Sequence, residues 1–163
     1  MVALDNVLRP EDRPVLQAIL ESSGFFYEYE VEVALSLFDE THEKGQDGSG
    51  YHWLMARENG DLLGFSVFGP NPSALYSWDL YWIALDERLR NRHIGTRLFE
   101  ASCRAAAARG ARTLWIETAG RPLYASTRSF YEKRGCTLAA TLHDFYAPGD
   151  DKLIYFRDLQ QPG

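Results

Sequence analysis

A cluster of arginines surrounds a glycine in the segment RLRNRHIGTRLFEA, residues 88–101. The cluster consists of Arg88, Arg90, Arg92 and Arg97, with Gly95 between the last two. The residues that follow have helical apolar spacing, so we expect the cluster at a helix N-terminus, where N–H groups and the helix dipole attract anions. A glycine there allows close backbone approach to a phosphate, and arginines neutralise its charge. The alternative is a solvated charged face.

Asp79 is the second residue with chemical interest. It lies in the run LYSWDLYWIAL, residues 75–85, whose apolar and aromatic content is typical of a strand buried on both faces. A carboxylate is costly to bury unless it is paired or hydrogen-bonded, so its position needs a catalytic or a structural reason. Glu117 is a second candidate carboxylate, at the end of the segment LWIE in the strand RTLWIET.

The balance of charge excludes several classes of partner. The 163-residue chain has a net charge of -6, which argues against a general nucleic-acid or membrane-surface binder. Its charged first residues do not resemble a signal peptide, and the chain lacks the ~20 consecutive apolar residues that span a bilayer. Two cysteines are too few for a disulfide framework, and the histidines have no metal-ligand spacing. We expect a single cytoplasmic domain over residues 1–163, without metal, nucleic acid or membrane as a partner.

Hydrophobic spacing and turn residues predict a mixed order of helices and strands. Residues 51–69 are expected to form a hairpin that turns at Asn59-Gly60, since both residues tolerate positive φ. The segment GQDGSG, residues 45–50, is expected to be a loop. The remaining elements are helices over residues 10–22, 28–45, 94–110 and 126–135, and strands over residues 75–85, 112–118, 137–147 and 152–159. Strand 75–85, helix 94–110 and strand 112–118 make a βαβ unit with parallel strands.

The segment LYWIALDERLRNRHIGTRL, residues 80–98, resembles the acetyl-CoA loop of the GNAT superfamily of N-acetyltransferases. The family pattern is Q/R-x-x-G-x-G/A after the fourth strand. Arg90 takes its first position and Gly95 its last. His93 stands where the first glycine is usual, and histidine is among the residues that tolerate the left-handed conformation.

A second segment, STRSFYEKRGC at residues 126–136, resembles the other signature of the family. Phe130, Tyr131 and Gly135 match it, whereas Cys136 replaces an aromatic residue. Tyr124 stands where many members have an asparagine. The resemblance implies a mixed α/β (α+β) fold: a mostly antiparallel twisted sheet with a central parallel βαβ unit and about four helices.

The resemblance also implies an activity, the transfer of an acetyl group from acetyl-CoA, as co-substrate, to a primary amine by direct attack in a ternary complex. The acceptor would be a small molecule, a protein N-terminus or a lysine. Both a monomer and a homodimer are compatible with the sequence. The residues expected to bind acetyl-CoA are Ile83, Ala84, Leu85, Arg90, Asn91, Arg92, His93, Ile94, Gly95, Thr96 and Tyr124.

Three residues are candidates for the chemistry that the resemblance implies. Tyr131 matches the tyrosine that many members use as a general acid toward the CoA thiolate, and its alternative role is core packing. Asp79 lies six residues before Leu85, where histone-modifying members have a glutamate base, and Glu117 is a competing base. The alternative function is a non-catalytic acyl-CoA-binding sensor or scaffold, which would need neither acid nor base.

Overall fold

The computed structural model describes residues 1–160, with the side chains of all of these except Arg90 and Asn91. The described residues form two compact units. Unit 1 contains Met1–Gly69 and Trp82–Ser102, and unit 2 contains Pro70–Tyr81 and the described residues from Cys103 onward. The expectation of a single domain over residues 1–163 stays a prediction.

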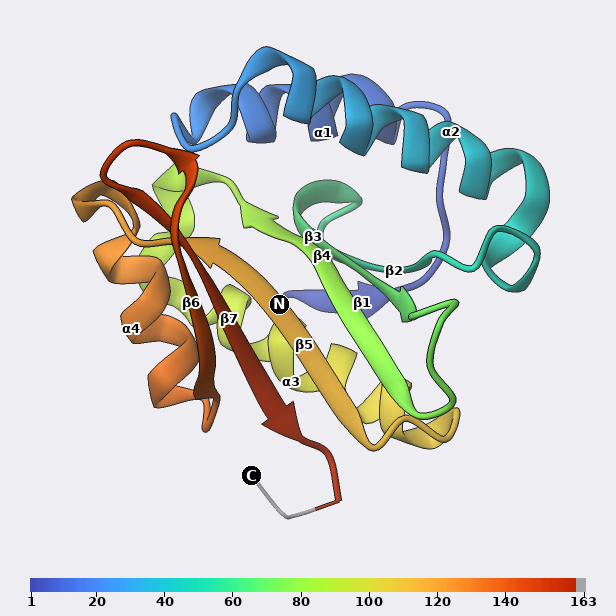
Figure 1. Ribbon diagram of the computed structural model, residues 1–163. Helices are drawn as coiled ribbons and strands as arrows, with labels where there is room; N and C mark the ends of the chain where they lie inside the picture. The colour runs from blue at the N-terminus through green and yellow to red at the C-terminus, as the bar shows by residue number, and fades with distance from the viewer. Residues whose placement is uncertain (161–163) are drawn as a thin grey trace. The chain divides into compact units, whose positions relative to one another are not determined.

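The described part of the chain contains four α-helices, two 3₁₀ helices and seven strands (Figure 1). The helices are α1 (Asp12–Ser22), α2 (Glu28–Ser49), η1 (Glu87–Arg92), α3 (Ile94–Ala108), η2 (Pro122–Tyr124) and α4 (Ala125–Lys133). The strands are β1 (Ala3–Asp5), β2 (His52–Glu58), β3 (Asp61–Pro70), β4 (Ser77–Leu85), β5 (Thr113–Ala119), β6 (Thr137–Ala147) and β7 (Asp150–Asp158).

The strands pair in the order β1-β2-β3-β4-β5-β7-β6, and β4 contributes residues to both units. β4 and β5 pair in parallel, from Ser77 opposite Thr113 to Leu80 opposite Ile116. The pairs β1–β2, β2–β3, β5–β7 and β6–β7 are antiparallel. Because α3 connects β4 to β5, these elements form the predicted βαβ unit. The predicted fold class, a mostly antiparallel sheet with one parallel pair and four helices, is confirmed.

Unit 1 is held by a hairpin, two helices and a buried apolar cluster. The hairpin of β2 and β3 turns at Asn59 and Gly60, with φ of 53° and 85°, as predicted. Val2, Ala56, Ile94 and Leu98 form a buried cluster, so the first turns of α3 are fixed against β1 and β2. Figure 1 shows α1 and α2 on the same side of the β2–β3 hairpin.

The end of α2 differs from the expectation of a loop over residues 45–50. The helix breaks at Gly45 (φ 79°, ψ 169°) and resumes for one more turn, which ends at Ser49. The side chain of Gln46 binds that turn to the rest of the unit, because its Oε1 accepts a hydrogen bond of 3.0 Å from Trp53 N and its Nε2 donates to the carbonyl oxygen of Asn6. Contacts distant in sequence therefore override the glycine-rich composition.

Unit 2 is built around β5, β7 and β6, which Figure 1 shows with β7 between the other two. β5 pairs with β7 along its whole length, from Thr113 opposite Asp158 to Ala119 opposite Lys152. The predicted burial of strand 75–85 on both faces is wrong. In β4, buried Trp78, Leu80 and Ala84 are separated by residues that are partly exposed. The other face of β4, which carries Ser77, Asp79 and Tyr81, is therefore only partly buried.

Candidate functional site

The turn from η1 into α3 lies at the arginine cluster. Asp86 begins it: its backbone N–H donates to Leu63 O at 2.8 Å, and its Oδ1 accepts from Arg88 N at 3.0 Å. His93 ends it in the left-handed conformation, with φ 59° and ψ 19°. α3 begins at the next residue, Ile94, which is 1 % exposed. The left-handed residue thus reverses the chain, and the helix starts with its first N–H groups beside an exposed turn, a geometry that favours anions.

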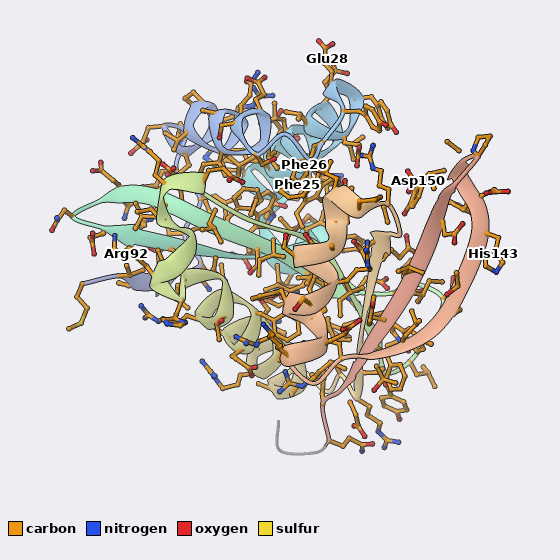
Figure 2. The ribbon with its side chains drawn as sticks, turned by 90° about the vertical axis from the view of Figure 1, so that its left-hand side faces the viewer. Phe25, Phe26, Glu28, Arg92, His143 and Asp150 are labelled. Atoms are coloured by element: carbon orange, nitrogen blue, oxygen red, sulfur yellow. The ribbon has the colours of Figure 1, made fainter. Side chains whose placement is uncertain are left out.

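Each described arginine of the cluster contacts an oxygen in unit 1. Arg88 pairs with Asp86 at 2.6 Å, and Arg92 pairs with Glu58 at 2.8 Å. Arg97 donates to the carbonyl oxygen of Val2 at 2.9 Å. Figure 2 shows Arg92 on η1, where its side chain is 44 % exposed. The carboxylates of Asp86 and Glu58 offset the mutual repulsion of these cations. Exposed ion pairs are weak, so an arginine in such a pair can exchange its carboxylate for another anion.

The predictions on Arg90 and Asn91 concern side chains that lie outside the described residues. The backbone of both belongs to η1. Of the other predicted residues in this turn, His93 is exposed, and Gly95 and Thr96 in the first turn of α3 are partly exposed. Residues 92, 93, 95 and 96 thus lie at the surface of this turn, fully or partly exposed.

The end of β4 holds Ile83, Ala84 and Leu85, the residues predicted to contact the acyl end of acetyl-CoA. Ile83 packs against the apolar cluster of unit 1, and Ala84 is buried. Gly64 on β3 lies so close that a Cβ there would stand 2.9 Å from the oxygen of Ala84 and 2.9 Å from Cβ of Leu85. Gly64 was not among the site residues predicted from the sequence, although a glycine inside a strand is a recognised signal of close backbone approach.

Asp79 is half-buried in β4 and has a defined partner in unit 2. Asn71 donates from Nδ2 to Asp79 Oδ2 at 3.0 Å. Burial raises the pKa of the Asp79 carboxyl, the Asn71 hydrogen bond lowers it, and the charge of Glu117 raises it again. The net pKa is raised, which makes Asp79 a better proton acceptor than an exposed aspartate. Asn71 was not among the residues predicted from the sequence.

Glu117 lies on β5, two residues after the Trp115 that pairs with Asp79. Its side chain is 58 % exposed, and Lys152 Nζ lies 2.9 Å from its Oε2. The ion pair with Lys152 occupies Glu117, whereas the hydrogen-bond partner of Asp79 is the neutral amide of Asn71. The structure therefore brings the two candidate bases onto neighbouring strands and distinguishes them by their partners.

Tyr131 and Tyr124 belong to the α4 region of unit 2. Tyr131 is 5 % exposed, with its ring 5.4 Å from that of Phe130 and 6.4 Å from that of Tyr155. Burial raises the pKa of the Tyr131 hydroxyl, so the residue keeps its proton at neutral pH. Tyr124 precedes α4, and the guanidinium of Arg121 lies 5.2 Å from the centre of its ring.

Residues 1–160 contain no group of three or more His, Cys, Asp or Glu side chains that could hold a metal ion. Among the helices of this same range, none has the length and apolar character needed to cross a membrane.

Comparisons with known proteins identify the family. A profile of the acetyltransferase (GNAT) family matches residues 16–136. A Desulfovibrio desulfuricans protein of the GNAT acetyltransferase family is 36 % identical, with a TM-score of 0.94 over 98 % of this chain and 99 % of that one. A search of curated proteins finds no match.

Two further structures share the fold at lower identity. The ribosomal-protein-S18-alanine N-acetyltransferase of Escherichia coli has a TM-score of 0.77 at 20 % identity, over 100 % of this chain and 97 % of that one. An aminoglycoside 6′-N-acetyltransferase complexed with coenzyme A has a TM-score of 0.78 at 18 % identity, over 100 % and 99 % of the two chains. The profile match and the 36 % identical relative show that this chain belongs to the GNAT family of acetyltransferases.

Proposed function

We propose that this protein transfers an acetyl group from acetyl-CoA to a primary amine, on a small molecule or at a protein N-terminus or lysine. The observation that carries the proposal is the η1–α3 turn, where left-handed His93 ends η1 directly before α3, beside exposed arginines. Structures of the same fold include a ribosomal-protein-alanine and an aminoglycoside acetyltransferase, the latter crystallised with coenzyme A. Both names describe an amine acceptor.

The CoA phosphates would bind at this turn. The backbone of residues 92–96 supplies N–H groups, and Arg92 can leave Glu58 for a phosphate because the pair is exposed. Arg90 and Asn91 complete the proposed phosphate site. Main-chain groups of Ile83, Ala84 and Leu85 would hold the acyl end, and Tyr124 would contribute a side-chain contact to CoA.

The proposed reaction needs one proton acceptor and one proton donor. The amine nitrogen attacks the thioester carbon, the carbon–sulfur bond breaks, and the amine proton passes to a base. Asp79, whose pKa is raised by burial, is the proposed base, and Glu117 is the weaker candidate because Lys152 holds it. Tyr131, which keeps its proton, would protonate the departing thiolate.

We place the protein in the cytoplasm, a reducing compartment, since Cys103 and Cys136 are both buried thiols. Its oligomeric state, monomer or homodimer, is a separate question that light scattering would answer.

A thiol-release assay tests the proposed activity. Acetyl-CoA is mixed with the protein and a panel of amines and N-terminal peptides, and free CoA is measured against an amine-free control. The wild type should release thiol with at least one acceptor class. Binding of acetyl-CoA without release for any acceptor would favour the sensor or scaffold function instead.

Tyr131→Phe tests the general acid in the same assay. The substitution keeps the ring and its packing but removes the hydroxyl proton, so turnover should fall ~10²–10⁴-fold. The affinity for acetyl-CoA should hardly change, because the hydroxyl acts in the transition state. Unaltered turnover, on an acceptor for which chemistry is rate-limiting, would leave Tyr131 as a packing residue.

A further inference from the structure

The connection between β3 and β4 is a short, hydrogen-bonded loop that begins at Asn71. The backbone N–H of Asn71 donates to Ser77 O at 2.9 Å, which closes the loop at the first residue of β4. Within the loop, Ala74 N donates to Asn71 O at 3.2 Å. The bond to Ser77 holds the backbone of Asn71 against the start of β4, two residues before Asp79 in the chain. The loop and Asp79 all belong to unit 2.

The side-chain amide of Asn71 has a single orientation that satisfies its neighbours. Its Oδ1 accepts a hydrogen bond of 2.8 Å from Ser73 N, the usual bond of an Asx turn. The Nδ2 group then faces Asp79 and donates to Oδ2 at 3.0 Å. Rotating the amide by a half-turn would place an acceptor against a carboxylate and a donor against an N–H. The loop backbone therefore determines which group Asp79 meets.

We propose that Asn71 is a positioning residue for acetyl transfer, whose amide holds the Asp79 carboxylate by one oxygen and leaves the other to receive the amine proton. This inference rests on the proposed role of Asp79 as the base. Asn71 itself touches neither reacting group. Its contribution is to restrict the rotation of the carboxylate and to favour its ionised form, because an amide N–H binds a carboxylate more strongly than a carboxylic acid.

The surroundings of Asp79 influence the pKa of its carboxyl in both directions. Burial raises the pKa of Asp79, and Glu117 on β5 raises it further, while Asn71 lowers it. Lys152 on β7 partly cancels the charge of Glu117 through their 2.9 Å ion pair. Asn71 thus opposes the protonation that burial and Glu117 favour.

Asn71→Ala should change the pH dependence of the reaction. Without the donated hydrogen bond Asp79 is protonated at higher pH, so a smaller fraction is available as base in the acid range. We expect kcat/KM of Asn71→Ala relative to wild type to be about tenfold lower at acid pH than at alkaline pH, where only the loss of carboxylate orientation remains. Protonation of the acceptor amine affects both proteins equally and cancels in this ratio. A ratio that is independent of pH would overturn the proposal.

A carbon-13 NMR titration provides a readout that does not depend on activity. The Asp79 carboxyl signal is identified by its absence in Asp79→Asn, and its midpoint is compared between wild type and Asn71→Ala. The midpoint should move to higher pH in the variant. An unmoved midpoint would contradict the role of Asn71, whatever the kinetics. If instead Asp79→Asn retains full activity while the midpoint moves, the assignment of Asp79 as base fails and the contact stands.

Two variants control for effects on the loop. Asn71→Asp preserves the oxygen that binds Ser73 N but puts a second carboxylate beside Asp79, so the midpoint should move in the same direction and further than in Asn71→Ala. Ser73→Ala keeps the backbone N–H and removes an exposed side chain of the same loop, so it should behave as wild type. Equal effects of Ser73→Ala and Asn71→Ala would show a general disturbance of the loop and would refute the proposal.

Discussion

Arg57 and Arg92 both bind carboxylates in unit 1, but their surroundings differ. Arg57 on β2 is 5 % exposed and donates to both oxygens of Asp12, at 2.7 and 2.8 Å. It also donates to Asp5 at 3.0 Å and to Val7 O at 2.8 Å, so it joins β1, β2 and α1. Arg92 on η1 is 44 % exposed and pairs with Glu58 at 2.8 Å.

The difference separates a structural arginine from one that can serve a ligand. A buried, multiply bonded ion pair cannot lose one partner without leaving the other charge unsolvated, so its geometry is fixed. An exposed pair contributes little because water competes with it, and either member can change partners at small cost. We infer that Arg57 stabilises the fold of unit 1, whereas Arg92 is available to a phosphate.

Arg57→Ala should have the largest effect on the free energy of unfolding. Removing the guanidinium leaves the buried carboxylate of Asp12 without its main partner, which typically costs ~3–5 kcal/mol. Urea denaturation measures the loss. The matched control is Arg13→Ala, because Arg13 binds Asp39 at 2.8 Å in an exposed pair. Equal destabilisation by the two substitutions would contradict the distinction between buried and exposed arginines.

Part of the same stabilisation should be lost in acid. Burial raises the pKa of Asp12, but hydrogen bonds from Arg57 and from the backbone of Arg9 lower it more, so the net pKa lies below the usual 3.8. A lowered carboxyl pKa stabilises the fold above its unfolded value, and this contribution disappears as pH falls through the folded value. Arg57, whose pKa is raised, stays charged throughout this range.

Urea midpoints measured from neutral pH down to about pH 3 test this expectation. The wild type should lose stability more steeply below about pH 4 than Asp12→Asn, which has no carboxylate at this position to protonate. Parallel pH profiles for the two proteins would show that the acid sensitivity arises elsewhere.

Gly95→Val should separate ligand binding from stability. A β-branched side chain in the first turn of α3 obstructs backbone approach to the pyrophosphate, so we expect acetyl-CoA affinity to fall by about a hundredfold. The thermal midpoint should change little, since Gly95 is partly exposed in a helix that valine can also adopt. Retention of full affinity would place the phosphates away from this turn.

Arg92→Ala should have a smaller effect on affinity, about tenfold, because the backbone N–H groups remain. Glu58→Gln is the informative partner: it releases Arg92 from its ion pair, so acetyl-CoA affinity should stay the same or rise. Calorimetric titration of both variants distinguishes an arginine that binds phosphate from one that merely pairs with Glu58. Equal affinities for Arg92→Ala and wild type would assign Arg92 to the surface pair.

The sequence predicts most elements of the fold because each has a local signal. The hairpin at Asn59-Gly60 and the helix before Gly110 follow from turn residues and apolar spacing. β1 was missed because three residues show no periodicity, and its place depends on pairing with β2 and on Arg57. The last turn of α2 was missed because Gln46 holds it through hydrogen bonds to Trp53 on the next strand and to Asn6, which is distant in sequence.

Of the candidate site, the sequence predicts the main residues but not their partners. The arginine cluster and Asp79 stand out by residue type and position. Their partners do not, because Glu58 and Asn71 are ordinary residues whose role depends on where the strands bring them. The raised pKa of Asp79 likewise arises from burial and from Glu117 on the neighbouring strand, neither of which a local pattern contains.

Calorimetric titration of acetyl-CoA into the wild-type protein, freed of any copurified ligand, tests the central claim most directly. Binding should weaken as salt is raised from low to physiological ionic strength, because arginines and helix N–H groups meet the phosphates. Arg57→Ala, measured where it is folded, should bind with the same salt dependence. Absence of binding, or binding that salt leaves unchanged, would contradict the assignment of the η1–α3 turn as the acetyl-CoA phosphate site.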